Sequence, residues 1–233
     1  TLWREMAERL SLRPEFLKGD WRRGADPAQI EARLRDDMKS PGERAIKAVC
    51  VVHNETSTGA TSRIDEVRKA MDAAGHPALL LVDTISSLGS IDYRHDEWGV
   101  DVTVAGSQKG LMLPTGMSFT GVSEKAMAAH KEARLPKFYF NWTKMLGRQQ
   151  RSFVGTIPIG LFYGLRESLR LIEEEGLENV FRRHARLGEA VRRCVRHWSG
   201  NSGPRLFCTN PGRYSDSVTA VLMPEGFDCE AVR

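Results

Sequence analysis

The chain has 233 residues, of which 41% are hydrophobic and 27% are charged, the composition of an ordinary globular protein. Its formal net charge of +4 is small, and an arginine-rich stretch from Arg182 to Arg196 is explained by the solvated face of a helix, so we expect no nucleic-acid partner. No apolar run reaches the length of a membrane span, and we expect no membrane partner.

The four cysteines and six histidines show no metal-ligand or CxxC spacing, so we predict no metal site. This cysteine usage favours a reducing, cytoplasmic location. The chain begins at Thr1 just before a helical pattern and stops at Arg233 just after what resembles a first helical turn. We therefore expect an internal piece of a longer chain.

Residues 2–10 have helical apolar spacing, and Asp26-Pro27 predicts the start of a helix that ends near Asp37. The apolar run Ile46 to His53 is typical of a strand buried on both faces. A polar loop follows it, and Ser62 to Asp65 resembles a capping box for a helix that reaches Ala74.

Three further strands are predicted at residues 78–82, 101–105 and 118–122, separated by short polar loops and helical patterns. This alternation predicts an α/β fold with a mostly parallel sheet and helices on both faces. The first three strands of the chain each end in polar or charged residues, and these residues can converge on one edge of the sheet.

The remaining chain reads as a helix at 124–134, an aromatic-rich segment at 136–147, two long helices divided by Gly176, a loop, and a strand at 217–223. The element order changes after Gly176. We therefore predict that residues 1–175 belong to a large domain and residues 176–233 begin a smaller α+β domain.

Two residues at strand ends indicate chemistry. Asp83 closes a strand of buried hydrophobes, where a carboxylate is costly unless a cation meets it. Lys109 follows the next strand between Gly106 and Gly110, and an amine held there can act as a nucleophile toward carbonyls. An amine that traps an aldehyde and an acid that pairs with a protonated pyridine are the two groups that pyridoxal phosphate requires. The plain alternatives are a loop-capping aspartate and a solvated lysine.

Three motifs in register then carry a resemblance: His53-Asn-Glu-Thr-Ser-Thr-Gly59, Leu81-Val-Asp-Thr-Ile-Ser-Ser-Leu-Gly89 and Gly106-Ser-Gln-Lys-Gly110. They are similar to those of the class V pyridoxal-phosphate-dependent aminotransferases, with serine–glyoxylate and alanine–glyoxylate aminotransferases as the nearest resemblance. The likeness continues to Thr219-Ala-Val-Leu-Met-Pro-Glu-Gly226. It implies the large domain of a type I pyridoxal-phosphate transferase fold.

The resemblance implies a role for each of five residues. Lys109 binds the cofactor covalently and acts as the catalytic base, and Asp83 pairs with the ring nitrogen. Thr56 and Gln108 bind the cofactor, and Thr156 reaches the phosphate of the partner subunit in a homodimer. Other parts of the family site, among them the arginine that binds the substrate carboxylate, are expected outside Thr1 to Arg233, so the chain by itself is expected to be inactive.

The resemblance implies transfer of an amine to glyoxylate to give glycine and a 2-oxo acid, with serine as the first choice of donor. Alanine and aspartate remain open as donors. A cysteine desulfurase-like lyase is a second alternative, although those enzymes usually carry His before the lysine, where this chain has Gln108. A non-catalytic fragment is the third.

Overall fold

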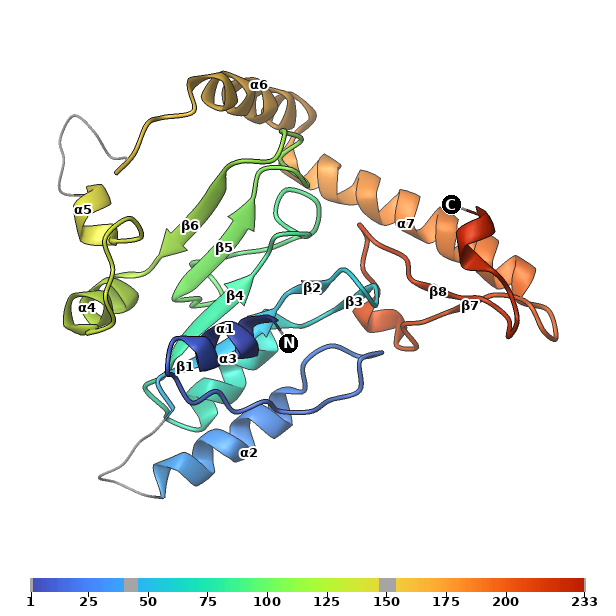
Figure 1. The fold of residues 1–233 in the computed structure, drawn as a ribbon. Helices are drawn as coiled ribbons and strands as arrows, with labels where there is room; N and C mark the ends of the chain where they lie inside the picture. The colour runs from blue at the N-terminus through green and yellow to red at the C-terminus, as the bar shows by residue number, and fades with distance from the viewer. Residues whose placement is uncertain (1, 40–45, 147–153, 233) are drawn as a thin grey trace.

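The computed structural model describes residues 2–39, 46–146 and 154–232, and a four-stranded sheet lies at its centre (Figure 1). The strands stand in the order β1 (Ala48–Val52), β4 (Leu79–Asp83), β5 (Val102–Gly106) and β6 (Ser118–Val122). The first three are parallel, and β6 runs antiparallel to β5. The predicted α/β fold with a mostly parallel sheet is confirmed, and the structure adds the direction of β6.

The core lies between this sheet and two helices, α2 (Pro27–Met38) and α3 (Ile64–Ala73). Leu80 and Val82 of β4 are fully buried in it together with Met71 of α3. Because side chains alternate along a strand, the intervening residues of β4, which include Asp83, point to the opposite face and are only half-buried. Asp83 therefore belongs to the less covered face of the sheet.

The two core helices begin differently. Asp26 caps α2 as predicted, since its carboxylate accepts a hydrogen bond from the amide of Ala28 at 2.9 Å. The predicted capping box at α3 is wrong, because Arg63 is the N-cap residue and makes no side-chain cap. The Ser62 hydroxyl instead accepts a hydrogen bond from the amide of Ala25 at 3.0 Å. A tertiary contact with a distant segment thus takes the group that a local pattern assigned to the helix.

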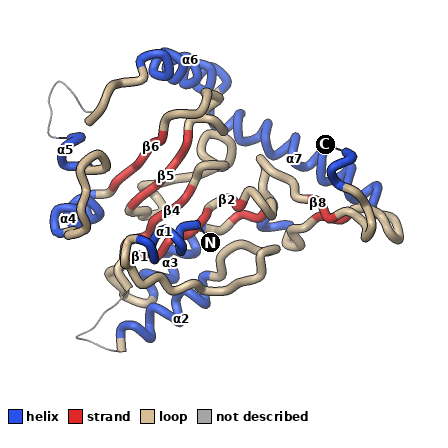
Figure 2. The backbone as a smooth tube through the Cα atoms, in the orientation of Figure 1, coloured by secondary structure: helices blue, strands red, loops and turns tan. Residues whose placement is uncertain are grey.

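The remaining elements lie around the sheet and to one side of it (Figure 2). They are α1 (Leu2–Arg9), β2 (Asn54–Glu55), β3 (Ala60–Thr61), α4 (Glu124–Glu132), α5 (Trp142–Leu146), α6 (Ile159–Glu175), α7 (Leu177–Ser199), β7 (Arg205–Leu206), β8 (Val221–Leu222) and the 3-10 helices Pro211–Arg213 and Cys229–Val232. The strand predicted at 217–223 is reduced to β8, which pairs with β7 in a segment expected to be a loop. Among the described residues, no helix has the length and apolar character to cross a membrane.

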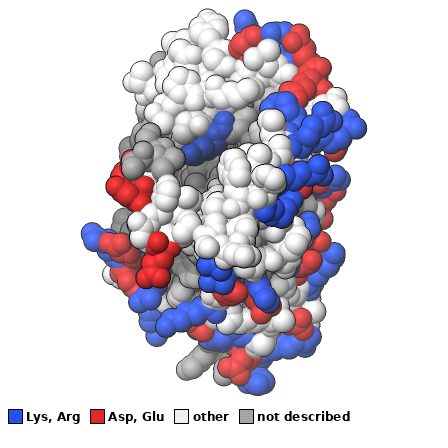
Figure 3. Space-filling model, turned by 90° about the vertical axis from the view of Figure 1, so that its right-hand side faces the viewer, with Lys and Arg blue, Asp and Glu red and all other residues white. Residues whose placement is uncertain are grey.

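Helices α6 and α7 meet at Gly176, whose φ of 81° lies in the left-handed region that glycine adopts without strain. The predicted domain boundary falls at this residue and stays a prediction. On the face of the molecule that includes α7, basic side chains lie beside acidic ones (Figure 3). Arg183 pairs with Glu175 at 2.7 Å and Arg193 with Glu189 at 3.1 Å. The arginine-rich stretch is thus largely a solvated, ion-paired helix face.

Candidate active site

The carboxyl ends of β1, β4 and β5 lie at the same edge of the sheet because the three strands are parallel neighbours. The loops that follow these strands also touch one another. The side-chain amide of Asn54, after β1, donates to the carbonyl oxygen of Ser86, after β4, at 3.2 Å. The loop after β4 in turn packs against the loop after β5, which carries Lys109. The three polar strand ends predicted from the sequence are therefore in contact with one another.

Asp83 is the last residue of β4, with Val52 of β1 and Val104 of β5 as its neighbours in the sheet. Burial raises the pKa of its carboxyl group, the amide of Ile85 lowers it by donating a hydrogen bond at 2.8 Å, and the negative charge of Glu55 raises it further. Within the described part of the chain, no basic side chain forms an ion pair with Asp83. The site is thus suited to a ligand that brings its own positive charge.

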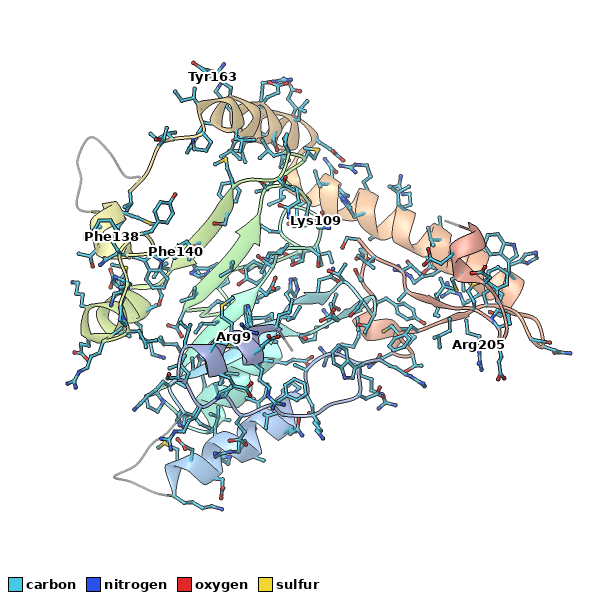
Figure 4. The ribbon with its side chains drawn as sticks, in the orientation of Figure 1. Arg9, Lys109, Phe138, Phe140, Tyr163 and Arg205 are labelled. Atoms are coloured by element: carbon cyan, nitrogen blue, oxygen red, sulfur yellow. The ribbon has the colours of Figure 1, made fainter. Side chains whose placement is uncertain are left out.

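Lys109 stands three residues beyond the end of β5, in a tight loop at the middle of the molecule (Figure 4). Its side chain is exposed. The loop is fixed by close packing of Gly110, since a Cβ atom there would lie 2.2 Å from the carbonyl oxygen of Leu88 and 2.5 Å from Oγ of Ser90. Only glycine allows the backbone that carries Lys109 to come so near the loop that carries Asp83.

Two of the other three cofactor-binding candidates lie at the same edge. Thr56 is exposed in the turn of the hairpin formed by β2 and β3, which directly follows β1. Gln108 is exposed beside Lys109, and its side-chain oxygen lies over Gly106, 2.9 Å from where a Cβ atom would stand. The structure therefore brings Asp83, Lys109, Thr56 and Gln108 to one edge of the sheet.

Thr156 differs from the other candidates. It is exposed in the segment that leads into α6, and no hydrogen bond among the described residues joins it to the other four. The aromatic segment is likewise separate, because Figure 4 shows Phe138 and Phe140 across β5 and β6 from Lys109. These two rings are 69% and 77% exposed. Phe138 and Phe140 therefore do not lie beside Lys109.

His53 lies near the site but has a structural environment. It is 4% exposed, shares a 2.9 Å hydrogen bond between Nδ1 and Oγ of Ser87, and packs on the rings of Tyr93 and Trp98. Burial lowers its pKa to about 4. This is the environment of a hydrogen-bonded structural histidine.

The sequence did not predict a group of hydrogen bonds that connects these loops to the C-terminal part of the chain. The Asn54 amide donates to Oγ of Ser86 at 2.8 Å and to Oγ of Ser217 at 3.2 Å. Each of these hydroxyl groups also donates a hydrogen bond to a backbone carbonyl oxygen. The Ser86 hydroxyl donates to the carbonyl oxygen of Asn54, and the Ser217 hydroxyl donates to that of Ser86. The amide of Ser215 also donates to the carbonyl oxygen of Gly59 at 2.9 Å. Asn54 and Ser86 could be expected near the site because each follows a predicted strand of the sheet. Nothing in the sequence places Ser217 there.

The arrangement is the α/β architecture of the pyridoxal-phosphate transferases, with an acid and a lysine at the carboxyl ends of adjacent strands. The Nostoc alanine–glyoxylate aminotransferase structure superposes with a TM-score of 0.83 at 30% identity, covering 98% of this chain and 58% of that one. The Bacillus subtilis ureidoglycine–glyoxylate aminotransferase gives 0.81 at 31% identity, covering 100% and 57%.

The chain belongs to the class-V aminotransferase family, whose model matches residues 1–229. The serine–glyoxylate aminotransferase of Methylorubrum extorquens is 48% identical over 99% of this chain and 57% of its own length. The L-aspartate–glyoxylate aminotransferase of Paracoccus denitrificans is 45% identical over 99% and 56%. The chain thus spans a little over half the length of the curated relatives it matches.

Proposed function

We propose that the protein containing this chain is a pyridoxal-phosphate-dependent aminotransferase that moves an amine from an amino acid, serine in the first instance, to glyoxylate. The products are glycine and a 2-oxo acid. The observation that carries the proposal is the position of Asp83 and of the loop with Lys109 at one edge of the sheet, in a chain of the class-V family. Serine comes first because relatives named serine–glyoxylate aminotransferase are 43–48% identical to this chain.

The residues present fit this cofactor. Asp83 is a half-buried carboxylate without a basic partner among the described residues, and a protonated pyridine nitrogen would supply the missing positive charge. The exposed amine of Lys109 lies in the loop next to the one that follows Asp83, where an aldehyde can reach it. The exposed side chains of Thr56 and Gln108 supply a hydroxyl and an amide at the same edge.

When bound, pyridoxal phosphate supplies an electrophilic aldehyde and a ring that takes up electrons. In the proposed mechanism, Nζ of Lys109 would hold the aldehyde and would take the proton from the α-carbon of the amino acid. Asp83 would pair with the ring nitrogen and favour its protonated form. Thr56 would hold the ring substituent, and Gln108 and the partner's Thr156 would bind the phosphate.

Alternative functions make different predictions. Alanine or aspartate as donor would change only the 2-oxo acid that is released. A cysteine desulfurase-like lyase would release sulfide from cysteine and form no glycine from glyoxylate. Gln108 at the position before Lys109 disfavours the lyase, since those enzymes usually carry a histidine there. A non-catalytic fragment would bind no cofactor.

The direct test is an absorbance spectrum of the longest form of the protein, including any sequence that adjoins Thr1 and Arg233. We expect a band near the edge of the visible range that borohydride converts to a covalent adduct. The Lys109→Ala variant should lack that adduct. If the adduct persists in this variant, the assignment of Lys109 is refuted, whereas sulfide production without glycine would favour the lyase.

We also propose a homodimer with shared sites, since Thr156 lies in the segment before α6 and not at the strand ends that carry the other four candidates. Mixing inactive Lys109→Ala with Thr156→Ala should recover about a quarter of the unmodified activity, because half of the dimers would be mixed and each would hold one intact site. Activity no greater than the sum of the separate variants would contradict shared sites. A cytoplasmic location stays a prediction.

A further inference from the structure

The hairpin that carries Thr56 is organised by one side chain. Glu55, the last residue of β2, pairs with Ala60 across the hairpin. Its carboxylate oxygen Oε1 accepts hydrogen bonds from the backbone amide of Ser57 at 3.0 Å and from the Ser57 hydroxyl at 2.6 Å. Its carbonyl oxygen accepts from the amides of Thr58 at 3.3 Å and Gly59 at 2.9 Å. Every one of these bonds closes the turn around Thr56.

Hydrogen bonds to a carboxylate are stronger than those between neutral groups. The bond from Glu55 to the backbone two residues on resembles the one by which Asn and Asp side chains fix turns. The far end of the turn is fixed as well. Gly59 has a φ of 65°, and a Cβ atom there would lie 3.0 Å from the amide nitrogen of Ala220 and 3.0 Å from the carbonyl oxygen of Val218. Thr56 is therefore held from both sides by contacts that its own exposed side chain does not make.

The negative charge of Glu55 also acts on the carboxyl group of Asp83. Val52, three residues earlier, is the sheet partner of Asp83, and the amide of His53 donates to the carbonyl oxygen of Asp83 at 2.9 Å. The charge of Glu55 contributes to the raised pKa of the Asp83 carboxyl group. Two nearby carboxylates repel each other unless a cation is present, so this arrangement favours a cationic ligand at the site.

We propose that Glu55 is a positioning residue of the cofactor site, which holds the turn at 56–58 in the conformation that presents the Thr56 hydroxyl to the cofactor. The inference rests on the proposed function, since it takes the ligand at Asp83 and Lys109 to be pyridoxal phosphate. It goes beyond that function by giving a role to a residue outside the five cofactor-binding candidates.

The test compares Glu55→Ala with Glu55→Gln in the longest form of the protein. Glutamine keeps an oxygen that can accept from the Ser57 amide, whereas alanine removes both side-chain bonds. Titration with pyridoxal phosphate should show binding weakened at least about tenfold in the alanine variant. Glutamine should restore binding to within about threefold of the unmodified protein. Ser57→Ala is the matched control, because it leaves the backbone bond intact and should also stay within about threefold.

Two further measurements separate positioning from general stability. The thermal unfolding midpoint of the cofactor-free protein should be the same in the alanine and glutamine variants. In the unmodified protein, the Ser57 amide should be protected from hydrogen exchange, which requires no variant to fold. The proposal is overturned if that amide exchanges freely, if alanine leaves binding unchanged, or if glutamine binds as weakly as alanine. Failure of the unmodified protein to bind pyridoxal phosphate would refute the proposed function as well.

Discussion

Replacing Gly110 by alanine should disturb the candidate site more than its size suggests. The added Cβ would lie 2.2 Å from the carbonyl oxygen of Leu88, 2.5 Å from Oγ of Ser90 and 3.0 Å from the carbonyl carbon of Gly89. Two of these three atoms belong to backbone, so rotation of a flexible side chain cannot relieve the overlap. The loop that carries Lys109 and the loop that follows Asp83 must move apart by about 1 Å to restore ordinary contact distances.

Overpacking of this kind usually costs about 1–3 kcal/mol, and we expect the unfolding free energy to fall by about 2 kcal/mol. The cost to the site should be larger, because a displacement of about 1 Å in a reacting group can lower a rate on the order of a hundredfold. The rate at which borohydride traps pyridoxal phosphate on Lys109 should therefore fall on the order of a hundredfold.

The assay pairs urea unfolding with this trapping rate in Gly110→Ala and in a control, Gly160→Ala. Gly160 lies in the first turn of α6, where an added Cβ atom would have no neighbour within 4 Å. Alanine there should stabilise the protein by up to about 1 kcal/mol, through the greater helix propensity of alanine. If Gly110→Ala matches this control in both measurements, the close approach of the two loops does not position Lys109.

Two further predictions concern stability. His53 has a folded pKa of about 4 against about 6.5 when unfolded, so the unfolded state binds the proton first, and stability is lost as the pH falls from about 6.5 to about 4. This loss in the free energy of unfolding should reach about 3 kcal/mol. Urea unfolding at several pH values should show that His53→Gln lacks this part of the pH dependence. If the variant and the unmodified protein lose the same free energy over this pH range, the prediction is wrong. Arg192 has a side chain only 8% exposed, and it donates to the carbonyl oxygen of Ser215 at 2.7 Å. Arg192→Met leaves that carbonyl without its partner and should lower the free energy of unfolding in urea by about 2 kcal/mol. The exposed control Arg193→Met should cost under about 1 kcal/mol, and equal losses in the two variants would refute the buried role of Arg192.

Much of the sheet and its chemistry could be predicted from the sequence for a local reason. Continuous apolar runs mark buried strands, and the residue that follows such a run must lie at the strand's carboxyl end. This places Asp83 and the loop of Lys109 at one edge as soon as the strands are known to be parallel neighbours. The spacing of three motifs adds the family, which the match over residues 1–229 confirms.

Other features depend on contacts between segments far apart in the chain, which no local pattern encodes. The antiparallel direction of β6 is set by its pairing with β5. Ser62 bonds Ala25 instead of capping α3, and Ser217 joins the loops after β1 and β4 across more than 130 residues of sequence. In each case a polar group is satisfied by a partner that only the folded chain brings near.

The sequence by itself therefore determined the strands, their polar ends and the residue types available for chemistry, since periodicity and composition are properties of short segments. The tertiary structure alone decided how closely the loops approach, which hydroxyl groups are already bonded, and that Glu55 closes the turn around Thr56. The physical reason is that hydrogen-bond partners and steric limits are set by distances in space, and these follow from the packing of the whole chain.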